Sequence, residues 1–569
     1  MSVKFFSNRV IYCIFIFFLM APLKLYSINH DQLNIQDFPI QNQIQERLNL
    51  LQDAKKNLKS SLTLSEKYIN KSNAFSLMNK YKEELKKTAS NEKLEKKLLL
   101  DIMVSLDKID AKNMINSNKF SLVYKKLFQI YDSYAKKILK DLHFVWLGGN
   151  LGEIQKSYIE IWAKVNPEYK IHIWYDPNSL YVYQTSSQIR KKIDPNGLIS
   201  LEDYNIMNTN DIRTFMAKQI IDMQDEFYVG VKNKDIITDN DRIQFLIDKN
   251  IIDKGQFLKR NSQQLKKEFT ENMSDFLAKN KNVILHDVKE VMLNSKLAPY
   301  YKKEMNERMN LAAASDMVRL EVLIQKGGIY IDVDILPTLK NEVNIFSGKL
   351  EKEELLKMQK LDNDLLKNIN IAMYESLFNN LQISGRKYST YYYDHLMSDK
   401  KIPDTYKFMF VKMKAHMNRF SHLKFEDLFN KIGKVYVIEG IFKMAGNLNN
   451  NIIASHKMKR ENDFLNQLRN KIIINYEDLI KNYRGVRVAI ENANYEVYLN
   501  STNRTKFYRY DGIKPNTFVT TELTGPLLYE EIIKKHFPAR LTNFIPNLDE
   551  KFSSYTEEDD RSSWSVKKK

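Results

Sequence analysis

Two pairs of charged residues near the middle of the chain have types and spacings that suit chemistry. Asp332 and Asp334 are separated by one residue, so on an extended backbone both carboxylates project from the same face and can share a cation. Asp316 and Arg319 are three residues apart, which on a helix places both side chains on one face. Paired acids after a strand are also common in solvated turns, and the second pair also suits an ion pair within a helix, so both interpretations stay open.

The residues around these pairs predict a helix, a glycine turn and a strand. Apolar side chains recur at the spacing of one helix face at Met317, Leu320 and Ile324. Gly327 and Gly328 supply a C-cap that can adopt positive φ, and the β-branched and aromatic run 329–331 predicts a buried strand that Pro337 soon ends. An α/β sheet presents its ligand groups beyond the carboxyl ends of such strands.

An earlier part of the chain predicts a βαβ unit and therefore an α/β fold class. The run LHFVW at 142–146 is followed by two glycines, a helical stretch at 154–165 and the run KIHIWY at 170–175. Trp146 ends the first strand, where a nucleotide would meet such a unit. A tryptophan there is also a good core residue, which is the interpretation that its position alone favours.

Charge and motif content narrow the class of function. The formal net charge of +18 calls for an acidic partner. The lysines are spread over helix faces with glutamates between them, and RRM, zinc-finger and homeodomain signatures are absent, so we expect an anionic membrane and no nucleic acid. HExxH, GxSxG and P-loop motifs are also absent, which excludes the common metalloprotease, serine hydrolase and NTPase chemistries.

Residues 1–27 are typical of a secretory signal peptide, and an uncleaved membrane anchor is the alternative. Lys4 and Arg9 precede the apolar run Val10–Ala21, which is short for a membrane span. Removing the three basic residues of this segment lowers the net charge from +18 to +15. Cys13, the one cysteine, is removed with it, so the mature chain has no thiol for a disulfide or a zinc site.

The rest of this 569-residue chain divides into parts that differ in hydrophobic periodicity and in Gly and Pro content. Helical periodicity with few Gly and Pro residues predicts a helical bundle first, and long polar stretches later predict helical insertions that decorate the sheet. The predicted parts are a bundle at 28–140, an α/β domain at 141–569, insertions at about 178–300 and 340–430, and a C-terminal lid at about 549–569.

Several blocks of the sequence closely resemble the glucosyltransferase domain of the large clostridial toxins. They are LHFVWLGG from Leu142, VNPEYKIHIWYDP from Val165 and NLAAASDMVRLEVLIQKGGIYIDVDILP from Asn310. An asparagine turn, a Thr-Gly-Pro before a helix and a terminal Ser-X-Trp follow in the family's order. The resemblance implies a GT-A glycosyltransferase fold with a Rossmann-like nucleotide-sugar-binding sheet. It also implies retaining transfer of one sugar from a UDP-sugar to a threonine hydroxyl of host Rho or Ras family small GTPases, by an enzyme that we expect to be a monomer.

The resemblance assigns four residues to the donor. Trp146 would stack on the uracil, which moves it from core residue to base-stacking residue. Asp316 would bind hydroxyls of the donor sugar, Arg319 would meet sugar or phosphate charge, and Tyr330 would touch the diphosphate. The cation and Arg319 would stabilise the negative charge that grows on the leaving UDP.

The resemblance also implies a bound Mn²⁺ or Mg²⁺, which suits oxygen ligands. Asp332 would hold the ribose and the sugar side and lie at the metal, and Asp334 would bind the cation directly. In the C-terminal segment SSWS, Ser562 belongs to the family's Ser-X-Trp, and the family's metal-ligating acid falls on Asp559, where aspartate replaces the usual glutamate.

Two further residues complete the predicted site. Trp564 is the tryptophan of Ser-X-Trp and would close over the donor as a lid. Asn449 or a neighbouring asparagine matches a sugar-contacting residue, and the flanking Leu448 and Asn450 favour UDP-glucose over UDP-N-acetylglucosamine.

Three functions remain to be separated. The first is a secreted toxin or effector that glycosylates host GTPases in the cytosol, with the N-terminal helices directing it to the membrane, as the family's bundle does. The second is a bacterial Asp-X-Asp glycosyltransferase that modifies glycans or other proteins. The third is a membrane-binding protein with a vestigial sugar site, against which the intact acids at 316, 332 and 334 argue.

Overall fold

The structure is a computed structural model that describes part of the chain. The described segments are 39–61, 73–87, 91–110, 117–180, 182–183, 233–236, 238–250, 262–305, 310–340, 427–433, 435–437, 443–444, 447–448, 451–457, 464–482, 523–536 and 552–554, with runs of one to three residues within 226–230 and 397–424. The predicted signal peptide at 1–27 lies outside them. The chain divides into two compact units, residues 1–135 and 136–569.

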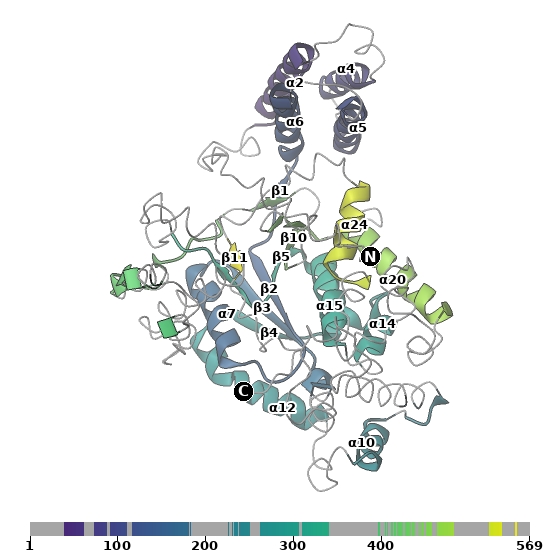
Figure 1. Ribbon diagram of the computed structural model, residues 1–569, viewed down its shortest axis with the longest axis vertical. Coiled ribbons are helices and arrows are strands. Elements are labelled where there is room, and N and C mark those ends of the chain that lie inside the picture. The colour runs from purple at the N-terminus through teal and green to yellow at the C-terminus, as the bar shows by residue number, and fades with distance from the viewer. Residues whose placement is uncertain are drawn as a thin grey trace, which may run out of the picture. The chain divides into compact units, whose positions relative to one another are not determined.

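The N-terminal unit contains helices whose apolar faces pack in pairs (Figure 1). They are α2 (Ile40–Ser61), α4 (Ala74–Leu85), α5 (Glu92–Asp110) and α6 (Ser117–Asp132). α2 packs against α6, and α4 packs against α5. Leu51, Leu58 and Met78 are among the side chains that this packing buries completely or almost completely. This arrangement follows from apolar residues that recur at helical spacing on one face of each helix.

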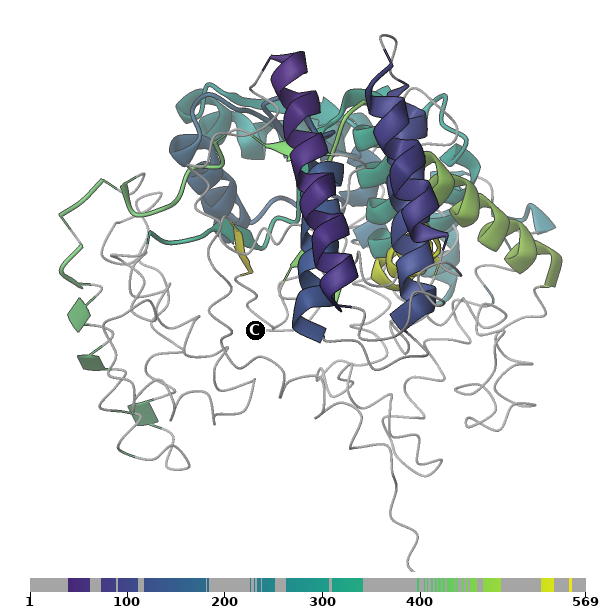
Figure 2. The same cartoon turned by 90° about the horizontal axis from the view of Figure 1, so that it is seen from above.

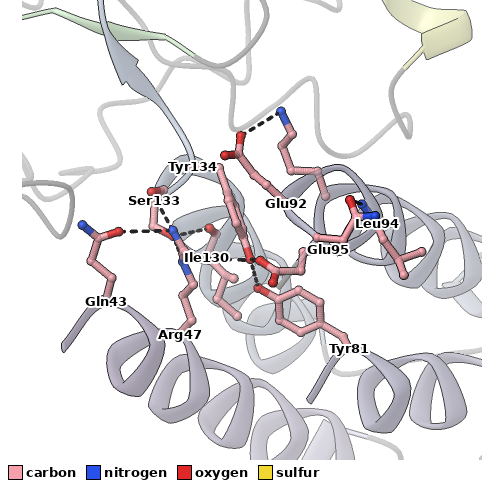
Figure 3. A network of polar contacts seen from close by, with 11 residues as sticks. Gln43, Arg47, Tyr81, Glu92, Leu94, Glu95, Ile130, Ser133 and Tyr134 are labelled. Carbon is pink, nitrogen blue, oxygen red and sulfur yellow. Dashed lines mark hydrogen bonds and ion pairs between the residues drawn. The ribbon is translucent and has the colours of Figure 1, made fainter. Parts of the chain in front are cut away.

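A buried arginine joins these helices (Figure 3). Arg47 donates from Nε to Ser133 Oγ at 2.8 Å, and its Nη1 lies 3.9 Å from Glu95 Oε2. Its guanidinium stacks on Tyr134 with Cζ 3.8 Å from the ring centroid, and Tyr134 donates to Glu95 at 2.5 Å. The Tyr81 and Tyr134 hydroxyls are 2.6 Å apart. The guanidinium and the carboxylate therefore balance one another inside the unit.

The second unit is built on a five-stranded mixed sheet with the order β10-β5-β2-β3-β4. The strands are β2 (Asp141–Trp146), β3 (Lys170–Tyr175), β4 (Val283–Asp287), β5 (Gly328–Ile331) and β10 (Ile452–Ser455). The first four are parallel, and β10 pairs antiparallel with β5 at one edge. β2, β5 and β10 are buried along nearly their whole length, as strands covered on both faces must be.

Helices cover both faces of this sheet (Figure 1). α7 (Glu153–Val165) and α12 (Ser262–Lys279) lie on one side, and α15 (Leu311–Lys326) and α14 (Ala298–Lys303) lie on the other. α20 (Phe464–Asn482) packs along α15, as Figure 1 and Figure 2 both show, and α24 (Pro526–His536) packs against α20. α15 contacts β2, β5 and β10, so it is the helix that lies on the centre of the sheet.

Short elements complete the described part of the chain. They are β1 (Lys136–Lys137), α10 (Asp239–Asp248), α13 (Lys289–Met292), β6 (Ile335–Pro337), β7 (Tyr436–Val437), β8 (Lys443–Met444), β9 (Asn447–Leu448) and β11 (Phe552–Ser554). β1 pairs with β7, β6 with β11 and β8 with β9, all antiparallel. No described helix combines the length and the apolar character needed to cross a membrane.

The predicted α/β class and the βαβ unit are confirmed by β2, α7 and β3, because β2 and β3 are parallel neighbours. The prediction that residues 178–300 only decorate the sheet with helices is wrong in one part, since β4 at 283–287 is a strand of the sheet itself. Its apolar run is only three residues long and stands between polar segments, so it gave too weak a signal of a buried strand.

Candidate active site

Helix α15 and the turn after it carry the predicted acids and the arginine. The Asn310 side chain caps the helix by accepting from the Ala313 N–H at 3.3 Å. The helix ends at Gly327, whose φ of 74° belongs to the region that glycine enters without strain. A Cβ on this glycine would lie 2.7 Å from the Lys457 backbone nitrogen. The predicted helix, glycine turn and strand are therefore confirmed.

Arg319 is the centre of a buried charged cluster. It projects from α15, is 8% exposed and reaches two carboxylates. Its Nη2 lies 3.2 Å from Asp316 Oδ1 and its Nη1 lies 3.3 Å from Asp332 Oδ1. Its Cζ lies 4.5 Å from the centroid of the Tyr330 ring. The i, i+3 spacing thus produces an ion pair, and the same guanidinium also joins α15 to the end of β5.

Tyr330 and Asp332 complete the cluster from β5. The Tyr330 ring is buried, and its hydroxyl donates to Asp332 Oδ1. Burial raises the pKa of Asp332, and the Arg319 guanidinium and the Tyr330 hydroxyl oppose that rise. Burial would lower the pKa of Arg319, but Asp332, Tyr330 and the other acids nearby outweigh it and raise the pKa above its usual value. The guanidinium therefore stays charged.

The two aspartates of Asp-X-Asp do not lie on an extended strand, so the prediction that they project together from one strand face is wrong. Residues 333 and 334 form a turn between β5 and β6, and Ile335 N–H donates to the Asp332 carbonyl at 3.1 Å. The physical reason is this local hydrogen bond, which turns the chain before Pro337. Asp332 consequently faces Arg319, whereas Asp334 is exposed.

Trp146 lies at the same edge of the sheet as this cluster. It is the last residue of β2, is 6% exposed and donates from its indole nitrogen to the Gly149 carbonyl at 2.7 Å. The chain moves from β2 to β3 and β4 in one direction and returns to β5 on the other side of β2. The carboxyl ends of β2 and β5 thus flank the point where strand order reverses, which is where α/β sheets bind ligands.

Sequence reasoning missed several residues that support these groups. Thr524, just before α24, donates from its hydroxyl to Asp316 Oδ2 at 2.8 Å, although 208 residues separate them. At the end of β3, the buried Asp176 accepts from Tyr301 at 2.7 Å, and Ser179 accepts from Gly148 N–H at 3.0 Å. In the sequence, Thr524 stands out only as part of Thr-Gly-Pro, which does not indicate a contact with Asp316. The Asp-Pro-Asn-Ser run after β3 indicates a turn but not the partners of Asp176 and Ser179.

Some predicted site residues lie outside the described part of the chain. They are Asn449, Asp559, Ser562 and Trp564. Within the described part, no group of three His, Cys, Asp or Glu side chains is arranged to hold a metal ion. Asp332 and Asp334 nevertheless suit a hard divalent cation, because they supply carboxylate oxygens beside a guanidinium that already pairs with Asp316 and Asp332.

Comparison with known proteins identifies the family. The family model described as the TcdA/TcdB catalytic glycosyltransferase domain matches residues 140–502, which is more than half of the chain. Cytotoxin-L of Paraclostridium sordellii is 30% identical over 223 residues, and Toxin B of Clostridioides difficile is 27% identical over 273 residues. These matches cover 38% and 45% of this chain, but only 9% and 11% of the length of the two toxins.

Solved structures of related domains have a similar fold. The catalytic domain of alpha-toxin from Clostridium novyi matches with a TM-score of 0.56 and 20% identity, over 86% of this chain and 94% of that one. The UDP-bound glycosyltransferase domain from the YGT toxin matches with a TM-score of 0.51 and 22% identity, over 76% and 83% of the two chains. The chain belongs to the TcdA/TcdB catalytic glycosyltransferase domain family.

Proposed function

We propose that the protein is a secreted toxin glycosyltransferase that uses a UDP-sugar as its donor. It transfers one sugar, with retention, to a threonine hydroxyl of a host Rho or Ras family GTPase in the host cytosol. UDP-glucose is the favoured donor and UDP-N-acetylglucosamine the alternative. The fold assigned with this proposal is GT-A. Family membership and the UDP-bound state of a related toxin domain support the choice of donor.

The observation that carries the proposal is the position of Trp146 and Asp332 at the carboxyl ends of two neighbouring strands, at the switch point of the sheet. Trp146 ends β2 and Asp332 directly follows the neighbouring strand β5, so one ligand can reach both. Trp146 offers an indole held in place by its bond to Gly149, which suits stacking on the uracil. Asp332, Arg319 and Tyr330 then lie toward the ribose, the diphosphate and the sugar.

The acids fit a divalent cation at the diphosphate. Asp316 and Asp332 pair with one guanidinium and Asp334 adds a third carboxylate whose field reaches it, which leaves an excess of negative charge where a dianionic diphosphate must also bind. A cation would relieve both, and Mn²⁺ or Mg²⁺ suits oxygen ligands. Asp334 would bind it directly with Asp332 beside it, and when bound it would withdraw charge from the β-phosphate as a Lewis acid.

The chain's own residues perform the remaining steps. Arg319 keeps its positive charge and lies beside the leaving diphosphate, so it stabilises the negative charge that develops there. Asp316 orients the donor sugar through its hydroxyls. Because these acids serve the donor and the cation, we assign no protein nucleophile, and the acceptor hydroxyl attacks on the face from which UDP departs.

Four residues outside the described part complete the proposed site. Asn449 would contact the sugar, Asp559 and Ser562 would add oxygen ligands to the cation, and Trp564 would close over the donor. These assignments rest on the match of their sequence blocks to the family. A closing tryptophan would exclude water from the diphosphate and so favour transfer over hydrolysis.

Transfer of radiolabelled sugar to a panel of small GTPases tests the proposal. The protein is incubated with Mn²⁺ and either UDP-glucose or UDP-N-acetylglucosamine, and label is followed on each GTPase and in free sugar. We expect label on at least one GTPase and little hydrolysis. Hydrolysis without label on any GTPase would remove the GTPase acceptor and leave a glycosyltransferase that acts on bacterial glycans or other proteins. Absence of both reactions would contradict the UDP-sugar assignment.

We also propose that the N-terminal unit binds anionic membrane. The described helices expose many lysines to solvent, among them Lys56, Lys59, Lys80, Lys82, Lys93 and Lys97. Basic residues near an anionic surface contribute on the order of 1 kcal/mol each to binding. This charge would concentrate the enzyme where lipid-anchored acceptors lie.

Co-sedimentation of the whole chain with vesicles tests the membrane proposal. The variant Lys56→Gln, Lys59→Gln, Lys80→Gln is compared with a matched control on α12, Lys266→Gln, Lys267→Gln, Lys279→Gln. We expect the first triple variant to lose affinity for phosphatidylserine vesicles and the control to retain it. Equal binding of the wild-type chain to neutral and anionic vesicles would contradict the proposal.

A further inference from the structure

A buried histidine lies in the centre of the sheet, and both of its ring nitrogens are engaged. His143 is on β2, is 1% exposed and is the register partner of Tyr330 on β5. Its Nε2 lies 2.8 Å from the Gly327 carbonyl, and its Nδ1 lies 3.2 Å from the indole nitrogen of Trp174. None of the donor contacts assigned above involves this side chain.

The two partners determine the protonation of the ring. An indole N–H can only donate and a carbonyl can only accept, so Nδ1 accepts from Trp174 and Nε2–H donates to Gly327. Burial lowers the pKa of His143 to about 3, and His172 nearby lowers it in the same direction. The ring is therefore neutral near pH 7 and remains a donor to the Gly327 carbonyl.

Neighbouring aromatic rings hold Trp174, whose indole N–H donates to His143. Trp174 stacks on His286 with centroids 4.5 Å apart, and His143 stacks on His172 at 4.9 Å. His172 Nδ1 and His286 Nε2 are 2.9 Å apart, a hydrogen-bond distance. Two imidazole nitrogens that share a tetrahedral zinc would be about 3.3 Å apart at the usual zinc–nitrogen length, so these rings form a hydrogen-bonded layer and not a metal site.

The carbonyl that His143 holds belongs to the turn between the two halves of the donor cluster. Before the turn, α15 carries Arg319, and after it β5 carries Tyr330 and leads to Asp332. Gly328 has a φ of 97°, and a Cβ on it would lie 2.9 Å from His143 Nε2, so the glycine leaves room for the ring. Arg319 Nη1 lies 3.3 Å from Asp332 Oδ1, so this ion pair joins the two elements that the turn connects.

We propose that His143 is a positioning residue of the donor site, which holds the Gly327 carbonyl and thereby keeps Arg319 on α15 within reach of Asp332 after β5. This inference rests on the proposed UDP-sugar site and adds to it a residue that touches no substrate. A change at His143 would act on the placement of the guanidinium that receives the leaving diphosphate. Misplacement by about 1 Å is enough to lose about a hundredfold in rate.

Two substitutions separate this role from a purely structural one. In His143→Gln, the amide nitrogen replaces Nε2 and retains the bond to Gly327, while Trp174 loses its acceptor. In His143→Asn, the shorter amide replaces Nδ1 and retains the acceptor for Trp174, while the Gly327 carbonyl loses its donor. Each variant loses one buried hydrogen bond, so the two should lose similar stability. A structural role would make them equivalent.

Calorimetric titration of UDP in the presence of Mn²⁺ gives the first readout. We expect His143→Gln to bind UDP within about threefold of the wild-type affinity and His143→Asn to bind about tenfold or more weakly. Equal losses in the two variants would overturn the positioning role. A folded Gln variant that loses tenfold in affinity would overturn it by itself, even if the Asn variant did not fold.

Hydrogen exchange gives a second readout that needs no ligand. We expect faster amide exchange in the segment 323–331 for His143→Asn and wild-type exchange there for His143→Gln. Similar exchange in both variants would overturn the inference. If wild-type protein did not bind UDP, the proposed donor would be wrong, and exchange in the turn would still decide whether His143 holds it.

Discussion

Each unit of this protein contains a buried arginine stacked on a tyrosine, and the two clusters differ in charge balance. Arg47 stacks on Tyr134, which donates to Glu95, and Arg319 stacks on Tyr330, which donates to Asp332. The first guanidinium faces one carboxylate within the N-terminal unit. The second pairs with two, Asp316 and Asp332, and the field of a third, the exposed Asp334, also reaches it.

This difference separates a structural cluster from one built to receive a ligand. A balanced and enclosed ion pair needs nothing further, although removing one partner leaves an uncompensated buried charge. A cluster with surplus negative charge is unfavourable until a cation arrives, so proteins keep such clusters where the cation has a function. An arginine, a tyrosine and an acid thus form a structural cluster in one unit, and under the proposed function a similar set binds the donor in the other.

The largest expected effect comes from removing the surplus charge. Asp332→Asn with Asp334→Asn should lower sugar transfer and UDP-sugar hydrolysis by at least about a thousandfold, because the cation loses its ligands. The melting temperature should fall, because Arg319 then keeps only its ion pair with Asp316. The control Glu95→Gln should leave turnover unchanged. Retained turnover in the Asp variant would contradict the metal assignment.

Breaking the balanced pair should act on stability alone. Arg47→Met leaves Glu95 buried without its cation, which should cost about 3–5 kcal/mol. Amides of α2 and α5 should therefore exchange several hundredfold faster, as measured by mass spectrometry, and UDP affinity should not change. Adding Glu95→Gln should restore much of the protection. A tenfold loss of UDP affinity in Arg47→Met would show that the two clusters are coupled.

Arg319→Lys should weaken catalysis while retaining the charge. A lysine cannot contact Asp316 and Asp332 simultaneously as the planar guanidinium does, so we expect turnover to fall by about 10²–10³. Arg469→Lys is the matched control. Arg469 lies on α20 and pairs at 3.5 Å with Glu321, which is on α15 as Arg319 is, and it takes no part in the proposed site. Equal losses in the two variants would argue for a general effect on α15.

The locally encoded parts of this site were predictable from the sequence. The helix around Asp316 and Arg319 and the strand before Asp332 follow from apolar periodicity and from Gly327, all within a short stretch of chain. The turn at Asp334 was not predicted, because one backbone hydrogen bond, from Ile335 to Asp332, overrides the extended conformation.

Contacts between distant residues were not predictable in the same way. Thr524 reaches Asp316, and His143 reaches Gly327 across 184 residues, through a sheet order that places β5 beside β2. No periodicity or spacing within a single segment reports such a pairing. Trp146 could be placed at the end of its strand, but the choice between core residue and base-stacking residue came from the family resemblance.

Unlike the two arginines, His143 is buried with no carboxylate bonded to either ring nitrogen, so its own charge is disfavoured in the folded protein. Its pKa of about 3 lies below the ordinary value of 6.5, so the unfolded chain binds more protons between these values and stability falls as pH falls through them. From pH 6.5 to 5 this loss is about 1.6 kcal/mol. All four tryptophans follow residue 136, so tryptophan fluorescence reports unfolding of the second unit. Urea titrations followed in this way should show the loss of stability in wild type and not in His143→Gln. Identical pH profiles would contradict it.

The smallest expected effect concerns the hydroxyl that supports Asp316. Thr524→Val keeps the side-chain shape and removes the 2.8 Å bond to Oδ2, which leaves Asp316 held by Arg319 through Oδ1. A hydrogen bond to a charged group contributes about 1.5–3 kcal/mol, part of which water can replace here. We therefore expect the KM for the UDP-sugar to rise about tenfold with little change in kcat. Thr524→Ser should restore the wild-type KM, because donation to the carboxylate and not the methyl group fixes the orientation of Asp316. A Val variant with unchanged KM would show that the Arg319 pair alone positions this acid, and the surplus-charge cluster would then need no support from the loop before α24.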